Sequence, residues 1–185
     1  MTRIIGISGS LRTGSFNTAL LRAAQTSFPD TLELATIRGI PLYDADIEAA
    51  EGVPPEVEQL KERIALADGL LLATPEYNNS MPGVFKNALD WLSRPPADIA
   101  RVFHGKAVAI IGATPGGFGT ILAQNAWLTV LRTLKTRPWL GGRLMVSGAH
   151  RLFDEEGKLT DDKTRELLQA YIRGFVAFAA DKSQQ

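Results

Sequence analysis

Short apolar runs alternate with longer amphipathic segments along the whole chain. Apolar runs of about four to eight residues predict strands, and apolar positions that recur every three to four residues predict helices. Two runs, 69–74 (Gly-Leu-Leu-Leu-Ala-Thr) and 106–111 (Lys-Ala-Val-Ala-Ile-Ile), can be buried on both faces. The predicted strands are 3–7, 32–37, 69–74, 106–111 and 140–146, and the predicted helices are 17–27, one ending near 67, 83–92, 120–133 and 161–180.

Strands that are apolar on both faces indicate a parallel sheet covered by helices on both sides. Right-handed crossovers then restrict the fold to a doubly wound α/β sheet. Five strands in 185 residues fit the strand order 2-1-3-4-5 better than a larger six-stranded order. Prolines and glycines predict a long loop after the second strand, and no repeat or linker divides the chain. We therefore predict a single domain over residues 1–185.

Composition narrows the function classes. Twenty basic and twenty acidic residues cancel, which argues against nucleic acid as a partner, although a neutral total could conceal a basic patch. The absence of cysteine excludes disulfides, thiolate nucleophiles and cysteine-bound metals. No apolar run reaches the roughly 18 residues of a membrane span, and no signal-peptide pattern opens the chain. A cytoplasmic location is the resulting expectation.

The first strand is followed by a polar loop, Gly-Ser-Leu-Arg-Thr-Gly-Ser-Phe-Asn-Thr, at residues 9–18. It combines hydroxyl groups, an amide and Arg12 with a helix N-terminus, whose free N–H groups and dipole attract anions. The loop lacks the Gly-Lys-Ser/Thr of a P-loop and the third glycine of the dinucleotide fingerprint. These absences favour a monophosphate ligand. The alternative is that Ser15 or Asn17 only caps the helix.

The third strand leads into a loop between two prolines, Pro75 and Pro82. The prolines exclude helix and leave residues 76–80 extended or turned, with backbone amides facing outward. Such a segment can donate hydrogen bonds to the polar edge of a planar ring, while Tyr77 and Met81 offer apolar surface to its face. The alternative is a plain connection to the next helix.

The fourth strand is followed by Gly-Ala-Thr-Pro-Gly-Gly-Phe-Gly-Thr at residues 112–120, whose glycines allow close approach of a ligand, or merely a flexible connection. All three loops follow strands of a parallel sheet, so they should open on the same edge. That shared edge is stronger evidence than any single loop. His104 and His150 belong to none of the loops and have no metal-ligand spacing, so we predict no metal site and no catalytic triad.

Two segments resemble the signatures of a known family. They are Gly-Ser-Leu-Arg-x-Gly-Ser-Phe-Asn at 9–17 and Pro-Glu-Tyr-Asn-x-Ser-x-Pro-Gly-x-x-Lys-Asn-Ala-x-Asp-Trp-Leu-Ser-Arg at 75–94, and Pro-Leu-Tyr-Asp at 41–44 is a third similar segment. The chain resembles the NADPH-dependent FMN reductases of flavodoxin-like fold, particularly the quinone and chromate reductase branch. The similarity extends over nearly the whole chain, and the two longer signatures together are specific.

The resemblance implies where FMN is bound. The residues implied around the FMN phosphate are Ser10, Arg12, Ser15, Phe16 and Asn17. Those implied along the edge of the isoalloxazine ring are Pro75, Glu76, Tyr77, Asn78 and Asn79, with Thr114, Gly116 and Gly117 on the other side. The family also implies a homodimer or homotetramer with the flavin near the subunit interface. Leu122 and Leu128 replace arginines of close relatives, which puts arginine-dependent tetramer contacts and anionic-substrate binding there in doubt.

The implied activity is that of an NAD(P)H oxidoreductase in which FMN passes hydride by a ping-pong cycle to quinones or similar flat acceptors, such as azo dyes, chromate or free flavin. NADPH and NADH both remain open as donors, because the sequence shows no 2′-phosphate motif. No catalytic side chain is predicted, since the flavin carries the chemistry. The alternatives are a flavodoxin-like electron carrier, disfavoured by the neutral charge, and a binding module that has lost FMN, disfavoured by the intact loops.

Overall fold

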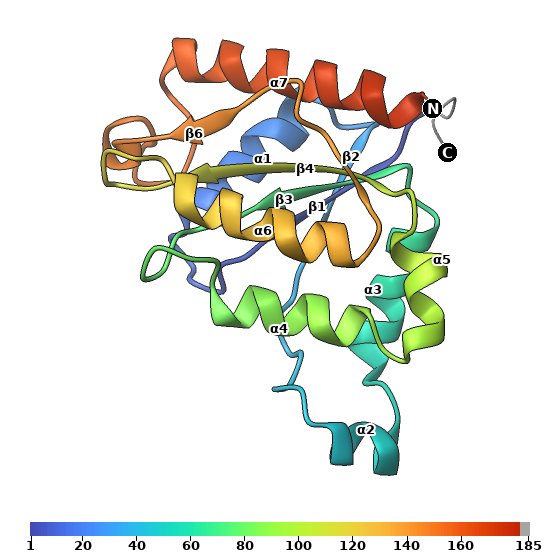
Figure 1. The fold of residues 1–185 in the computed structure, drawn as a ribbon. Helices are drawn as coiled ribbons and strands as arrows, with labels where there is room; N and C mark the ends of the chain where they lie inside the picture. The colour runs from blue at the N-terminus through green and yellow to red at the C-terminus, as the bar shows by residue number, and fades with distance from the viewer. Residues whose placement is uncertain (182–185) are drawn as a thin grey trace.

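The structure is a computed structural model that describes residues 1–181, and it places a parallel sheet between two layers of helices (Figure 1). The strands are β1 (Ile4–Ser8), β2 (Leu32–Ala35), β3 (Gly69–Ala73), β4 (Ala107–Ala113), β5 (Arg137–Pro138) and β6 (Leu144–Val146). The helices are α1 (Phe16–Ser27), α2 (Ala45–Glu51), α3 (Pro55–Ala65), α4 (Gly83–Leu92), α5 (Ile99–Phe103), α6 (Ile121–Thr133) and α7 (Asp162–Ala180). The last four residues of the predicted domain lie outside the described residues.

The strand order is β2-β1-β3-β4-β5, and every described strand pair is parallel. This confirms the predicted doubly wound sheet of order 2-1-3-4-5 with helices on both faces. The three central strands run in register, with Ile5 beside Leu70 and Leu70 beside Val108. Because the strands are parallel, their carboxyl ends meet at one edge, the left edge in Figure 1.

The fifth strand position differs from the prediction. Instead of one strand over 140–146, the structure has β5 and β6, which pair with opposite ends of β4. Residues 140–143 are not strand, and the Gly141-Gly142 pair explains the break, because glycine weakens strands. The Tyr171 hydroxyl of α7 donates to the Ile110 carbonyl of β4 at 2.8 Å beside this gap. Where the fifth strand is interrupted, a side-chain hydroxyl thus donates the hydrogen bond to a carbonyl at the edge of β4.

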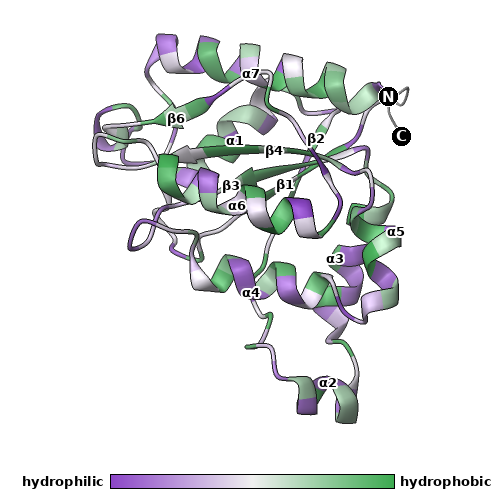
Figure 2. Cartoon of the chain, in the orientation of Figure 1, coloured by the Kyte–Doolittle hydropathy of each residue, from purple (hydrophilic) through white to green (hydrophobic). Residues whose placement is uncertain are grey.

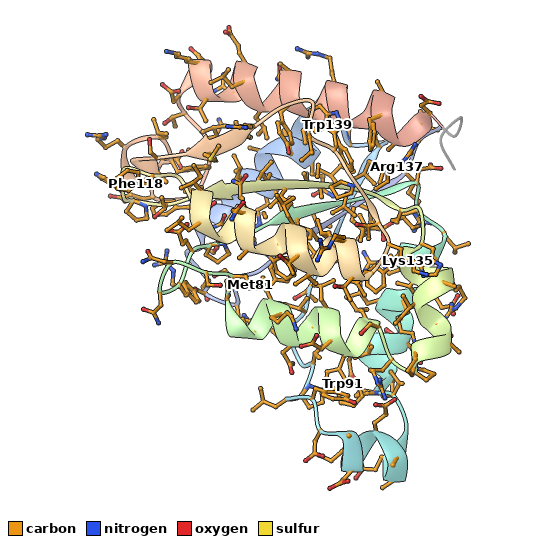
Figure 3. The ribbon with its side chains drawn as sticks, in the orientation of Figure 1. Met81, Trp91, Phe118, Lys135, Arg137 and Trp139 are labelled. Atoms are coloured by element: carbon orange, nitrogen blue, oxygen red, sulfur yellow. The ribbon has the colours of Figure 1, made fainter. Side chains whose placement is uncertain are left out.

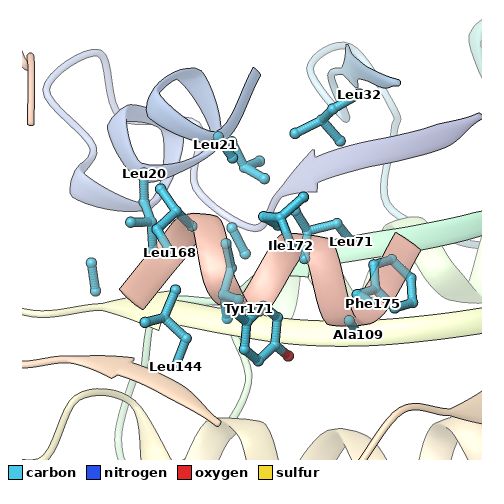
Figure 4. Packing of buried hydrophobic residues seen from close by; sticks show 14 of the residues in the cluster. Leu20, Leu21, Leu32, Leu71, Ala109, Leu144, Leu168, Tyr171, Ile172 and Phe175 are labelled. Carbon is cyan, nitrogen blue, oxygen red and sulfur yellow. The ribbon is translucent and has the colours of Figure 1, made fainter. Parts of the chain in front are cut away.

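Alternate residues of the central strands face two separate cores. Leu71, Ala109 and Ile111 pack against α1 and α7, and the close view in Figure 4 shows Leu20 and Leu168 from those helices on this side. The neighbouring strand residues face the layer of α3, α4, α5 and α6. The strands are correspondingly apolar along their length (Figure 2). Burial on both faces is the physical reason that these strands read as continuous apolar runs.

The loop predicted after the second strand contains a helix. Helix α2 buries none of its residues and projects from the body of the molecule (Figure 1). Asp44 caps it by accepting from the Asp46 N–H at 2.8 Å, and Glu48 accepts from the Tyr43 hydroxyl and from Arg94. The prediction was wrong here because caps and polar contacts, rather than an apolar stripe, stabilise α2. The short helix α5 was missed as well.

Candidate functional site

Three loops leave the carboxyl ends of β1, β3 and β4 and lie at the same edge of the sheet. We call them loop 1 (residues 9–17), loop 2 (residues 74–82) and loop 3 (residues 114–120). The sheet's hydrogen bonding continues into them, since the Gly9 N–H donates to the Ala73 carbonyl at 2.8 Å and the Thr74 N–H to the Ile111 carbonyl at 2.9 Å. The shared edge predicted from the sequence is therefore present.

Loop 1 leaves backbone donors unused. Among the described residues, the N–H groups of residues 13–17 donate to no protein acceptor. Ser15 caps α1, because its hydroxyl accepts from the Thr18 N–H at 3.3 Å. The helix cap predicted as the alternative is thus present at Ser15. It bonds the N–H of Thr18, so the N–H groups of residues 13–17 stay without a protein acceptor. A helix N-terminus with several free N–H groups is an anion receptor.

Arg12 lies exposed at the rim of loop 1. Its guanidinium lies 5.9 Å from the ring centroid of Phe16, which in turn packs 5.7 Å from the ring of Phe153. The Ser10 hydroxyl accepts from the Arg12 N–H at 3.3 Å and so bends the loop. No carboxylate pairs with Arg12 in residues 1–181, so its charge is available to an anion.

The side chain of Asn17 has a structural task that sequence reasoning missed. Its amide nitrogen donates to the Ala113 carbonyl at 2.9 Å, and its oxygen accepts from the Ala113 N–H at 2.9 Å. Both polar atoms of this buried side chain are therefore used to join α1 to the end of β4. Only the backbone N–H of Asn17 remains for a ligand. The partner is 96 residues away, so no local pattern indicates the contact.

Loop 2 is a tight hairpin. Tyr77 and Ser80 exchange two backbone hydrogen bonds of 3.0 Å, and the residues between them have positive φ, 50° at Asn78 and 61° at Asn79. This is a type I′ turn, which asparagine tolerates better than most residues. Pro75 is buried, while Tyr77 is 50% exposed. Of the extended and turned alternatives, the turned one is observed.

Glu76 connects loop 2 to α6. Its carboxylate accepts from the N–H of Leu122 at 2.8 Å and of Ala123 at 3.0 Å. Thr120, which precedes α6 in a left-handed conformation, supplies no side-chain cap. A carboxylate at a helix N-terminus is favourable by hydrogen bonding and by the helix dipole. The Glu76 side chain is therefore a remote cap, a role that the sequence did not reveal.

Loop 3 is anchored at its start and open at its tip. The Thr114 N–H donates to the Val146 carbonyl at 2.9 Å, and the Gly148 N–H donates to the Gly116 carbonyl at 3.0 Å. A Cβ added at Gly116 would meet only the Thr114 hydroxyl at 3.7 Å, and one at Gly117 would meet nothing. Neither packing nor a positive φ requires these two glycines, which is consistent with close approach of a ligand.

The tip of loop 3 carries Phe118, which is 83% exposed and stands at the outer end of the molecule in Figure 3. Met81, at the end of loop 2, lies partly buried against the core on the α4 side. Apolar surface is thus available beside both loops.

Other glycines below the loops are required by packing. A Cβ at Gly9 would overlap the ring of Phe85. A Cβ at Gly112 would overlap the Thr120 hydroxyl and lie 2.6 Å from the Thr74 carbonyl oxygen. The backbone at Gly9 therefore packs against a side chain of α4 and the backbone at Gly112 against loops 2 and 3, so closely that only glycine fits at either position.

Perturbed titratable groups lie outside the three loops. Arg94, in the second signature, donates to Glu48 at 2.8 Å, and this hydrogen bond holds the pKa of the Glu48 carboxyl below its ordinary value. Burial raises the pKa of the Tyr171 hydroxyl at the sheet gap. In the described part of the chain, no three potential metal ligands gather, and no helix has the length and apolarity to cross a membrane. The loops offer amides, hydroxyls and one guanidinium, a donor set that suits a phosphate ester and the polar edge of a ring.

Residues 2–151 match the family model described as NADPH-dependent FMN reductase. The chain belongs to this family. The NAD(P)H-dependent FMN reductase of Pseudomonas aeruginosa is 49% identical over 173 residues, which cover 92% of this chain and 91% of that protein. The 2-hydroxy-1,4-benzoquinone reductase of a Burkholderia species is 37% identical and is covered to 97%, as is this chain. The Escherichia coli quinone reductase is 35% identical, over 95% of this chain and 94% of that one.

A solved structure agrees with these relatives. The flavoenzyme NAD(P)H:(acceptor) oxidoreductase FerB from Paracoccus denitrificans superposes with a TM-score of 0.85 at 33% identity, covering 97% of each chain. Membership of the FMN reductase family confirms the predicted resemblance, the oxidoreductase class and the flavodoxin-like fold. It also confirms FMN and a nicotinamide nucleotide as the family's cofactors.

Proposed function

We propose that loops 1, 2 and 3 form the FMN site of this chain. The observation that carries the proposal is the row of unused N–H groups at residues 13–17 beside unpaired Arg12. These donors would hold the FMN phosphate. The proposed phosphate contacts are Ser10, Arg12, Ser15, Phe16 and Asn17, the ring-edge contacts are Pro75, Glu76, Tyr77, Asn78 and Asn79, and the opposite wall is Thr114, Gly116 and Gly117.

Loop 2 would orient the ring. The N–H groups of Glu76, Asn78 and Asn79 have no acceptor in the described chain, so they can donate to the polar edge of the ring. The hairpin and the Glu76 cap fix these amides before a ligand arrives, which lowers the entropic cost of binding. FMN, when bound, supplies the hydride chemistry. We place no catalytic side chain, because the residues of the site bind and orient.

The substrates proposed are NAD(P)H as donor and quinones or similar flat acceptors, with azo dyes, chromate and free flavin as further candidates. Two relatives named as quinone reductases support this choice. The exposed Tyr77 and Phe118 beside the open loops fit a flat second substrate better than an enclosed one. An electron carrier without turnover is disfavoured, because the chain has no acidic excess for docking.

We also propose a homodimer or homotetramer. Helix α6 exposes Ile121 (42%), Leu122 (46%) and Leu128 (37%), and Leu140 beside it is 75% exposed. The same residues border an apolar hollow of about 380 Å³ that extends to Trp139. In such an oligomer the subunits would meet through apolar side chains, with Leu122 and Leu128 at positions where close relatives carry arginines. Light scattering on the eluting protein tests this, and a monomer at micromolar concentration would contradict it.

The cytoplasm is the proposed location, because NAD(P)H, the proposed donor, is held inside cells. Fractionation of the producing cells tests this location. Recovery outside the cytoplasmic fraction would contradict it.

The deciding experiment uses the purified chain. Its visible spectrum is recorded before and after addition of FMN, and NADPH oxidation is then followed with and without benzoquinone in air. We expect flavin bands and quinone-stimulated oxidation of NADPH. Absence of FMN binding would contradict the proposed site. Flavin bands without quinone-stimulated turnover would favour the electron carrier.

A further inference from the structure

A second hollow borders loop 1. We call it the basic pocket. It measures about 450 Å³ and lies between loop 1, α1, the end of β2 and α3. The side chains that give it its character are Arg12, Arg22, Arg38, Arg63, Thr13 and Thr36. No aspartate or glutamate lines it, although acidic and basic residues are equal in number in the whole chain.

Most of the charge in the basic pocket is uncompensated. Arg63 is paired with Glu33 at 2.7 Å, so its charge is shared. Arg12, Arg22 and Arg38 have no carboxylate partner within residues 1–181. Guanidinium groups repel one another, and an anion between them removes the repulsion. The pocket is therefore built to receive negative charge.

Two of these arginines exceed what one phosphate needs. FMN carries a single phosphate, for which loop 1 already offers its free amides and Arg12. Arg22 lies farther along α1, and its side chain makes no hydrogen bond or ion pair in the described part of the chain. Arg38 follows β2 and donates to the Leu11 carbonyl at 2.5 Å, which holds it at the loop. Arg38 is thus held at the loop, and neither Arg22 nor Arg38 has a carboxylate partner among residues 1–181.

We propose that the basic pocket binds a second phosphate ester, the 2′-phosphate of NADPH, and that Arg22 and Arg38 make NADPH the preferred donor. The inference rests on the proposed function. NADPH differs from NADH only by this phosphate, and guanidinium groups bind phosphate oxygens with paired hydrogen bonds. The pocket shares Ser10, Leu11, Arg12 and Thr13 with loop 1, so the two proposed phosphate sites adjoin.

The kinetic test compares both donors. In the FMN-loaded protein, Arg22→Gln is expected to lower kcat/KM for NADPH about tenfold and to leave kcat/KM for NADH unchanged, from loss of a charged hydrogen bond. Arg173→Gln is the matched control, because Arg173 is exposed on α7 and outside the pocket. An equal fall with both donors, or no fall with either, would overturn the proposal.

The binding test needs no turnover. Calorimetry with 2′-AMP, 5′-AMP and inorganic phosphate is expected to show the strongest binding for 2′-AMP, weakened about tenfold by Arg22→Gln and unaffected by Arg173→Gln. Phosphate binding as strong as that of 2′-AMP would overturn the nucleotide assignment. If Arg22→Gln loses FMN affinity but keeps 2′-AMP binding, the pocket belongs to the flavin phosphate, and this result would also overturn the proposal. Arginine-dependent 2′-AMP binding in a protein without FMN binding would contradict only the proposed function.

Discussion

Loops 1 and 2 start at neighbouring strands and open on the same edge, yet they use their polar groups in opposite ways. Loop 1 leaves the N–H groups of residues 13–17 without acceptors, and its Arg12 has no ion-pair partner in the described chain. Loop 2 closes on itself through the Tyr77–Ser80 pair and is anchored to α6 by Glu76. Loop 1 therefore keeps donors that an anion could use, whereas the turn of loop 2 is held by contacts within the protein.

This difference separates the groups expected to determine FMN affinity from those expected to determine the stability of the fold. Substitution of an exposed group of loop 1, such as Arg12, should weaken FMN binding and leave folding intact, whereas Gly9, Ser15 and Asn17 of the same loop serve the fold. Substitutions in loop 2 and beneath it should cost stability first, because the Tyr77–Ser80 backbone pair and the Glu76 carboxylate already make hydrogen bonds within the protein. If substitutions of exposed groups in loop 1 instead cost stability and those in loop 2 only weakened FMN binding, the comparison would be wrong.

The largest expected effect is on stability, at the glycine beneath loops 2 and 3. Gly112→Ala would force a Cβ into the Thr120 hydroxyl and the Thr74 carbonyl, so we expect a loss of about 3 kcal/mol from overpacking. Urea unfolding measures the loss. Gly117→Ala is the matched control, because its Cβ meets nothing, and its stability should change by less than about 0.5 kcal/mol. Equal stability of the two variants would contradict the packing explanation.

Arg12→Ala should act on affinity alone. We expect roughly a 10- to 100-fold weaker FMN affinity in a fluorescence titration, because a charge-assisted phosphate contact is lost. The melting temperature of the FMN-free protein should stay constant, since Arg12 is exposed and has no ion-pair partner in the described chain. Arg132→Ala, exposed on α6, is the control and should leave FMN affinity unchanged. Unchanged affinity in Arg12→Ala would place the phosphate elsewhere.

Glu76→Ala should lower stability by about 1–2 kcal/mol, because α6 loses its only side-chain cap among the described residues. Glu76→Gln keeps an oxygen acceptor at the same place and should recover part of the loss. Chemical unfolding of both variants provides the measurement. If alanine and glutamine cost the same, the cap does not depend on the acceptor and this assignment is wrong.

The elements that locate the site could be predicted from local pattern. Runs such as 69–74 predict buried parallel strands, and the loops that follow them must share an edge. The split of the fifth strand was missed, although the Gly141-Gly142 pair lies at the break; what the sequence could not show is that Tyr171 of α7 bonds the Ile110 carbonyl of β4 there. Helix α2 was missed because it has no apolar stripe.

Side-chain roles within the site were harder to predict than its position. Asn17 reaches Ala113, 96 residues away, and Glu76 reaches Leu122, 46 residues away. Such contacts depend on the finished fold, and the same residue types also suit a ligand site. The sequence therefore located these residues correctly at the loops but did not show that their side chains are engaged within the protein.

The smallest expected effect concerns the turn of loop 2. Asn79 has a φ of 61°, a left-handed conformation that alanine adopts less readily, so Asn79→Ala should cost about 1 kcal/mol. Asn79→Gly should be tolerated, because glycine adopts this conformation without strain. Thermal unfolding compares the two variants, and FMN titration reports the ring-edge amides. If Asn79→Ala instead weakens FMN without loss of stability, loop 2 depends on its ligand for shape, as loop 1 does, and the contrast between the loops fails.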